Sequence, residues 1–139
     1  MVLLHMLSRQ SDARIVVAHF DHGIREDSYE DARFVAGLAK QYGFPFVVKR
    51  EELGAQASEA LARERRYAFL YEQAEMFHGQ IVTAHHADDV LETIAINITR
   101  GTGWRGLAVF SSTDIIRPLL GFTKTLLRHY ALDHRLEWV

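Results

Sequence analysis

The sequence contains no cysteine, and this absence excludes disulfides, thiolate zinc sites, cysteine-ligated iron–sulfur clusters and thiol nucleophiles. No apolar run approaches the roughly 20 residues that a membrane helix needs. Residues 1–7 also lack the basic flank and the small-residue cleavage site of a signal peptide. We therefore expect a cytoplasmic protein that has no membrane partner.

An excess of positive charge is missing as well, because the formal net charge is −2. A nucleic-acid binder that works alone usually has a basic surface. Any contact with nucleic acid must therefore use a local basic patch or another domain.

The chain has 139 residues, of which 48% are hydrophobic, and this suits a single domain with its own core. Apolar periodicity and turn residues predict strands that alternate with helices. The strands are expected at 14–20, 45–49, 81–84 and 115–116, and the helices at 2–7, 28–42, 58–77, 88–99 and 123–134. This alternation predicts an α/β fold with a three-layer, Rossmann-like, mostly parallel sheet.

The N-terminal end of this pattern is unusual, because helix 2–7 leads into a strand and no strand precedes it. A parallel α/β sheet normally starts with a strand, and the turn after that strand usually carries the phosphate-binding loop. We therefore expect this chain to lack the first strand and its loop.

Two imidazoles and three carboxylates lie close together in the segment 83–93, where the end of a predicted strand meets the start of a predicted helix. Asp88 and Asp89 fall in the first helical turn, where the helix dipole favours carboxylates, and Glu92 lies one turn further along. The dipole does not account for His85 and His86 beside them. The cluster indicates a site in which carboxylates hold Mg²⁺ and an imidazole meets a phosphate or a base.

A second polar group follows the first predicted strand, where His19, Asp21 and His22 precede Gly23. Such residues at the carboxyl end of a strand can line a nucleotide pocket, with a histidine on the base or ribose and Asp21 on a metal. An ordinary Asp-Gly turn with solvated histidines explains the same residues equally well.

Basic residues form a third group on the predicted helix 58–77, where Arg63 and Arg66 lie one turn apart and could contact phosphates. A solvated helix face is the simpler explanation for them. The glycine-bearing loop 100–106 adds Arg100 as a weaker phosphate candidate, although a helix C-cap at Gly101 explains that loop too.

Taken in order, five segments resemble the catalytic domain of the tRNA(Ile)-lysidine synthase family, in the PP-loop (N-type) ATP pyrophosphatase superfamily. They are HFDHG at 19–23, ARERRY at 62–67, AHHADDVLET at 84–93, RGTGWRGL at 100–107 and IIRPLL at 115–120. The resemblance implies an adenine nucleotide alpha hydrolase-like fold. It also implies an ATP-dependent ligase that adenylates the wobble cytidine of a minor isoleucine tRNA and joins lysine to it.

The resemblance implies ATP and Mg²⁺ as cofactors, and tRNA(Ile) and free L-lysine as partners, with a homodimer as a candidate assembly. It implies catalytic roles for Asp89, Asp88, Arg63 and His86, and metal binding by Asp89 and Glu92. Cofactor contacts are implied for His19, Asp21, His22, Arg66, His85 and Arg100, and more weakly for Arg117.

The family signature Ser-Gly-Gly-x-Asp-Ser does not occur in this sequence, and helix 2–7 resembles the helix that follows it. We therefore expect residues 1–139 to be one partial pyrophosphatase domain without the tRNA-binding C-terminal domains, inactive when alone. Two other functions stay open. One is a metal-dependent phosphohydrolase that uses the histidine and aspartate residues, and the other is a non-catalytic nucleotide-binding module.

Overall fold

The structure is a computed structural model that describes residues 1–9, 12–24, 27–54, 56–99, 101 and 113–138. Its elements in chain order are α1 (Val2–Ser8), β1 (Val17–Asp21), α2 (Ser28–Gln41), β2 (Phe46–Arg50), α3 (Glu59–Met76), β3 (Ile81–Val82), α4 (Ala87–Thr99), β4 (Ile115–Ile116) and α5 (Lys124–Asp133). The described residues form two compact units, one over 7–79 and the other over 1–6 with 80–138.

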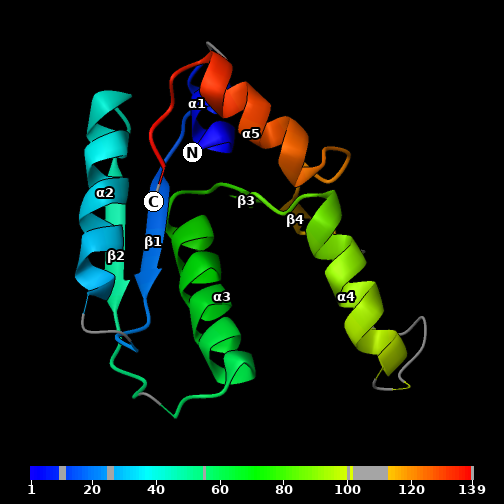
Figure 1. The fold of residues 1–139 in the computed structure, drawn as a ribbon. Coiled ribbons are helices and arrows are strands. Elements are labelled where there is room, and N and C mark those ends of the chain that lie inside the picture. Colours follow the sequence, from blue (N-terminus) through cyan, green and yellow to red (C-terminus); the bar gives the residue numbers. More distant parts are fainter. Residues whose placement is uncertain (10–11, 25–26, 55, 100, 102–112, 139) are drawn as a thin grey trace. The chain divides into compact units, whose positions relative to one another are not determined.

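The unit over 7–79 is built on β1 and β2, which pair in parallel with Val17 opposite Phe46 and Asp21 opposite Arg50. Helix α2 connects the two strands and packs along both of them, while α3 contacts β1 (Figure 1). Because the strands are parallel and in register, their carboxyl ends meet at the same edge. This edge holds the polar turn that follows β1.

Two aromatic side chains fill the core of this unit. Phe20 of β1 and Phe69 of α3 are both buried, and their ring centroids lie 5.8 Å apart. Helix α3 begins as the sequence predicts, since the Ser58 hydroxyl accepts a hydrogen bond from the Leu61 backbone N–H at 3.2 Å. Ser28 precedes Asp31 by three residues, as in a capping box, and this spacing predicts Ser28 as the cap of α2. The prediction is wrong, because Ser28 is already the first helical residue.

The other unit contains a second parallel pair, in which Ile81 of β3 lies opposite Ile115 of β4. Both isoleucines are buried, together with Leu119 and Ala131. The pairing fixes the segment after β3, because the Thr83 backbone N–H donates to the Ile116 carbonyl at 2.9 Å. The residues that follow Thr83 lead directly into α4.

The α/β class and the parallel pairing of the strands are confirmed. The predicted elements agree with the observed ones to within about three residues at each end. Most of the loop 100–106, including Arg100, lies outside the described residues. Within the described part of the chain, no helix is both long and apolar enough to cross a membrane. The single domain over 1–139 stays a prediction.

Candidate functional site

The turn after β1 is held by Asp21, whose side chain is buried. The carboxylate Oδ1 of Asp21 accepts a hydrogen bond from the Gly23 backbone N–H at 2.9 Å. Gly23 has a φ of +60°, and a Cβ atom at this position would lie 3.0 Å from the Cα of Glu52. Both the backbone angle and the close approach therefore require glycine here.

The other carboxylate oxygen of Asp21, Oδ2, lies 3.3 Å from a guanidinium nitrogen of Arg50 at the end of β2. Burial alone would raise the pKa of Asp21. The Gly23 N–H, the nearby Ser28 hydroxyl and the Arg50 charge outweigh burial and hold this pKa below its usual value. Asp21 is therefore ionised at neutral pH and has a partner on each oxygen.

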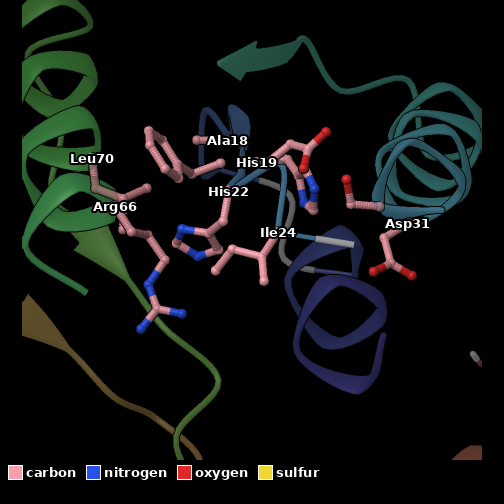
Figure 2. A pocket seen from close by; sticks show the side chains of 10 residues that line it. Ala18, His19, His22, Ile24, Asp31, Arg66 and Leu70 are labelled. Carbon is pink, nitrogen blue, oxygen red and sulfur yellow. The ribbon is translucent and has the colours of Figure 1, made fainter. Parts of the chain in front are cut away.

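A cavity of about 480 Å³ opens beside this turn. Its lining consists of Ala18, His19, Phe20, Asp21, His22, Ile24, Ser28, Asp31, Arg66 and Leu70. Figure 2 shows Arg66 and Leu70 on the side of α3 and Asp31 on the side of α2, with His19 and His22 between them. The cavity thus combines two imidazoles, one guanidinium group and several apolar side chains.

Both histidines of the cavity are held in the neutral form. Burial lowers the pKa of His19 and of His22, and the positive charge of Arg66 lowers the pKa of His22 further. Among the residues that the structure describes, none makes a hydrogen bond to the buried Nδ1 of His22. A neutral imidazole offers one donor and one acceptor, which suits the polar edge of a base or a sugar hydroxyl.

The two predicted phosphate-binding arginines share an aromatic neighbour. The guanidinium carbons of Arg63 and Arg66 lie 5.1 Å and 5.6 Å from the centroid of the Tyr67 ring. Of the two, only Arg66 lines the cavity. Arg65 pairs instead with Glu51, with 3.7 Å between Nε and Oε1. The structure therefore brings Arg66 together with His19, Asp21 and His22.

The acidic cluster lies in the other unit, at the start of α4. The Asp89 Oδ2 accepts a hydrogen bond from the His86 backbone N–H at 2.8 Å, so Asp89 reaches back over the first turn as in a capping box. The Asp88 Oδ2 accepts from the Lys124 backbone N–H at 2.7 Å, which joins α4 to the start of α5. Each aspartate thus uses one oxygen to hold a helix N-terminus.

The His86 ring lies between these carboxylates. Its Nδ1 is 3.5 Å from the Asp89 Oδ2 and 3.8 Å from the Asp88 Oδ2. His85 is oriented differently, with its Nδ1 2.8 Å from the Thr83 hydroxyl. The structure therefore places His86, Asp88 and Asp89 in one cluster, while Glu92 is exposed on the next turn of α4.

The cluster fits a magnesium ion only in part. Mg²⁺ usually takes one or two protein carboxylates and fills its other positions with water and substrate phosphates. Asp88 and Asp89 could supply such carboxylates together with a phosphorylated substrate. No group of three histidine, aspartate or glutamate side chains within the described ranges could hold a metal ion by itself. The phosphohydrolase alternative stays a hypothesis.

Sequence reasoning missed three residues that support these groups. Arg50 could have been found, because parallel strands in register place their last residues side by side. Tyr67 could also have been found, because an aromatic residue next to two predicted phosphate-binding arginines can contact their guanidinium groups. Lys124 could not, because it contributes only a backbone N–H, which no side-chain pattern shows. Arg117 donates from Nη1 to the Ile115 carbonyl at 3.3 Å, so it supports the segment after β4.

A parallel α/β fold with polar side chains at the carboxyl ends of its strands is typical of nucleotide-binding proteins. The family model described as "PP-loop domain" matches residues 1–139, so the chain belongs to the PP-loop domain family, which binds ATP.

Curated relatives extend this likeness over nearly the whole chain. The chain is similar to tRNA(Ile)-lysidine synthase of Thermus thermophilus, with 42% identity over 145 residues, 99% of this chain and 28% of that protein. It is 39% identical to the Zymomonas mobilis tRNA(Ile)-lysidine synthase over 89% of this chain and 42% of that protein. The Thermotoga maritima protein of the same name is 34% identical over 100% of this chain and 36% of its own length. The predicted resemblance is confirmed, and the chain spans less than half of each relative.

Proposed function

We propose that this chain is part of an ATP-dependent ligase that converts the wobble cytidine of a minor isoleucine tRNA to lysidine. The observation that carries the proposal is the match of 99% of the chain to a protein named tRNA(Ile)-lysidine synthase, at 42% identity. The cavity beside β1 and the acidic start of α4 supply the residue types that this chemistry needs.

In the proposed reaction, the cytosine carbonyl oxygen attacks the α-phosphate of ATP, and pyrophosphate leaves. The side-chain amine of free lysine then attacks the adenylated carbon, and AMP leaves. Both steps place negative charge on phosphate oxygens, so cationic donors close to them lower the barrier. The cytosine must also be unstacked, which costs little in a single-stranded anticodon loop.

We propose that the cavity beside β1 binds ATP. His19 and His22 are neutral, so they can meet the base or the ribose without an added charge. Arg66 lines the same cavity and can form charge-assisted hydrogen bonds with a phosphate. Arg63 shares the Tyr67 ring with Arg66 and is proposed as a second phosphate contact.

The acidic start of α4 is proposed to act on the pyrophosphate and on the reacting base. When bound, Mg²⁺ would neutralise charge on the leaving pyrophosphate, and Asp89 and Glu92, with Asp88 beside them, are the carboxylates proposed to hold it. The His86 ring lies within 3.8 Å of both aspartates and is proposed to orient a phosphate or the cytosine. His85 is proposed as the alternative to His86 in this role, and Arg100 and Arg117 are proposed as weaker cofactor contacts.

The proposal is tested with the intact protein, purified, with ATP, Mg²⁺, lysine and a transcript of the minor isoleucine tRNA. We expect AMP release that needs both the tRNA and lysine, and lysidine in the nucleosides of the digested tRNA by mass spectrometry. The matched control is the same transcript with uridine at the wobble position, which should give neither product. AMP release without any change in the tRNA would contradict the proposal.

One rival function has a clear signature in the same experiment. A non-catalytic nucleotide-binding module would bind ATP through the same cavity but leave every tRNA unmodified.

A cytoplasmic location is proposed with the ligase, since its tRNA and ATP substrates are found there.

A further inference from the structure

The end of β1 is fastened to the end of β2 by a series of contacts that continue past the strands. The Asp21 carbonyl accepts from the Glu51 backbone N–H at 2.9 Å, and the His22 carbonyl accepts from the Leu53 N–H at 3.1 Å. The Asp21 carboxylate adds the ion pair with Arg50 and the hydrogen bond from Gly23. The backbone around His22 is therefore held on both sides.

Asp21 and Arg50 differ in exposure, and this difference indicates what each can do. Asp21 belongs to the lining of the cavity, but its side chain is only 3% exposed and both of its oxygens already have partners. The Arg50 side chain is 44% exposed, does not line the cavity, and has its other terminal nitrogen 3.5 Å from the Glu52 Oε1. Glu52 is also the residue whose Cα lies against Gly23. Arg50 therefore bridges the buried carboxylate and the segment that packs on the turn.

The residue that directly follows Asp21, His22, lines the cavity. Its ring meets Phe20 edge-on, with 5.0 Å between the centroids, and its Nδ1 is buried without a hydrogen-bond partner in the described part of the chain. A buried polar atom without a partner is costly unless a ligand or water completes it. The position of the ring thus depends on the backbone that Asp21 and Arg50 hold.

We infer that Asp21 and Arg50 are positioning residues that fix His22 in the cavity and act on nucleotide binding through His22, without touching the nucleotide. The identity of the ligand as ATP rests on the proposed function, whereas the placement of His22 does not. This assigns Asp21 a role different from that of a metal or cofactor ligand, and it adds Arg50 to the site.

The test uses the intact protein with its histidines labelled at Cε1 for NMR, and His22→Ala identifies the His22 signal. Arg50→Gln removes the ion pair, and Asp21→Asn keeps an acceptor for the Gly23 N–H. We expect both changes to shift the His22 signal and to weaken ATP binding about 5- to 30-fold. Arg50→Lys, which keeps the charge, should restore most of the affinity.

A double variant separates positioning from direct contact. If Arg50 acts through His22, then Arg50→Gln should weaken ATP binding no further in a protein that already carries His22→Ala. The matched control is Lys49→Ala, because Lys49 lies beside Arg50 on β2. This substitution removes an exposed ion pair with Glu72 of α3. This control should leave both the His22 signal and the affinity unchanged.

Three results would overturn the inference. The first is that the His22 signal does not respond to Arg50→Gln. The second is that neither Arg50→Gln nor Asp21→Asn changes the affinity for ATP. The third is that Arg50→Gln weakens ATP binding as much in the His22→Ala protein as in the unaltered protein. Thermal melting shows whether each variant is folded, and Arg50→Gln, at a half-exposed site, is the variant expected to fold. If the unaltered protein fails to bind ATP, the proposed function fails, while the His22 signal still decides the positioning claim.

Discussion

The Oδ2 atom of Asp88 lies 2.7 Å from the backbone nitrogen of Lys124, so a single hydrogen bond joins the first turn of α4 to the first turn of α5. Asp88, which the sequence predicts as a catalytic residue, therefore also stabilises the fold. The two roles can be separated, because an amide oxygen can accept the same hydrogen bond but carries no charge.

We predict that Asp88→Ala lowers the free energy of unfolding by about 1 kcal/mol, as the loss of a helix-capping acceptor usually does. Asp88→Asn should cost less than half of that, because its amide oxygen still accepts from Lys124. Urea denaturation of the two variants beside the unaltered protein measures the difference. If both variants lose the same stability, the hydrogen bond to Lys124 does not contribute as described.

Gly23 should be far less tolerant of substitution than another glycine with a similar backbone angle. Gly23→Ala combines a φ of +60° with a Cβ atom 3.0 Å from the Glu52 Cα, so either the turn or the segment 51–52 must shift. Gly43→Ala is the matched control, since its φ is +71° and nothing lies within 4 Å of the added atom. We expect about 1 kcal/mol of destabilisation at Gly43 and roughly 2 to 3 kcal/mol at Gly23. Equal losses in thermal melting would show that the contact with Glu52 relaxes freely.

The lowered pKa of the half-buried His22 predicts a specific dependence of stability on pH. Burial lowers the pKa of His22 in the folded protein below its ordinary value of 6.5, so the unfolded chain binds the proton more readily. Stability should therefore fall as the pH drops through 6.5 toward the folded pKa. His22→Gln should flatten this part of the profile in denaturation series between pH 7.5 and about 5. A profile unchanged by the substitution would argue against a lowered pKa of His22 in the folded protein.

Asp21 predicts a second transition at lower pH. Because its folded pKa is depressed, its contribution to stability is present above the ordinary carboxyl value of 3.8 and is lost as the pH falls through the folded pKa. Asp21→Asn should lower stability at neutral pH and make it less sensitive to acid below about pH 4. The same denaturation series, continued into acid, measures this effect. An acid response identical to that of the unaltered protein would contradict the prediction.

The ring and the hydroxyl group of Tyr67 should have separate effects. The hydroxyl is buried and makes no hydrogen bond to any described residue, so Tyr67→Phe should leave stability unchanged or slightly raised. The ring lies beneath Arg63 and Arg66, so Tyr67→Leu should raise the KM for ATP severalfold by letting both guanidinium groups move. Thermal melting and steady-state kinetics measure the two effects. A Tyr67→Phe variant with the same KM change as Tyr67→Leu would show that the hydroxyl matters instead.

The helices and strands could be predicted because capping residues and apolar spacing lie within each element itself. Ser58 and Thr123 cap α3 and α5 where hydroxyl side chains precede helical spacing, and the buried, apolar Ile81 begins β3. The cap of α2 could not be predicted, because Asp27 and Ser28 are both good capping residues and the residue found at the cap, Asp27, makes no side-chain capping hydrogen bond.

The candidate site was predictable in its residue types but only partly in its geometry. His19, His22 and Arg66 were all marked from the sequence, and they line one cavity. The sequence could not show that Asp88 holds a backbone N–H of α5, since this contact joins segments far apart in the chain. Long-range contacts of this kind depend on packing, which local spacing does not encode.

Binding of ATP in the cavity beside β1, with Arg66 on its phosphates, can be tested by two neighbouring substitutions. Arg66→Ala removes the guanidinium group from the cavity, while Arg65→Ala removes one that pairs with Glu51 outside it. Calorimetric titration of the intact protein with ATP should show about 10- to 100-fold weaker binding for Arg66→Ala and nearly unchanged binding for Arg65→Ala. Equal affinities for the two variants would contradict this account.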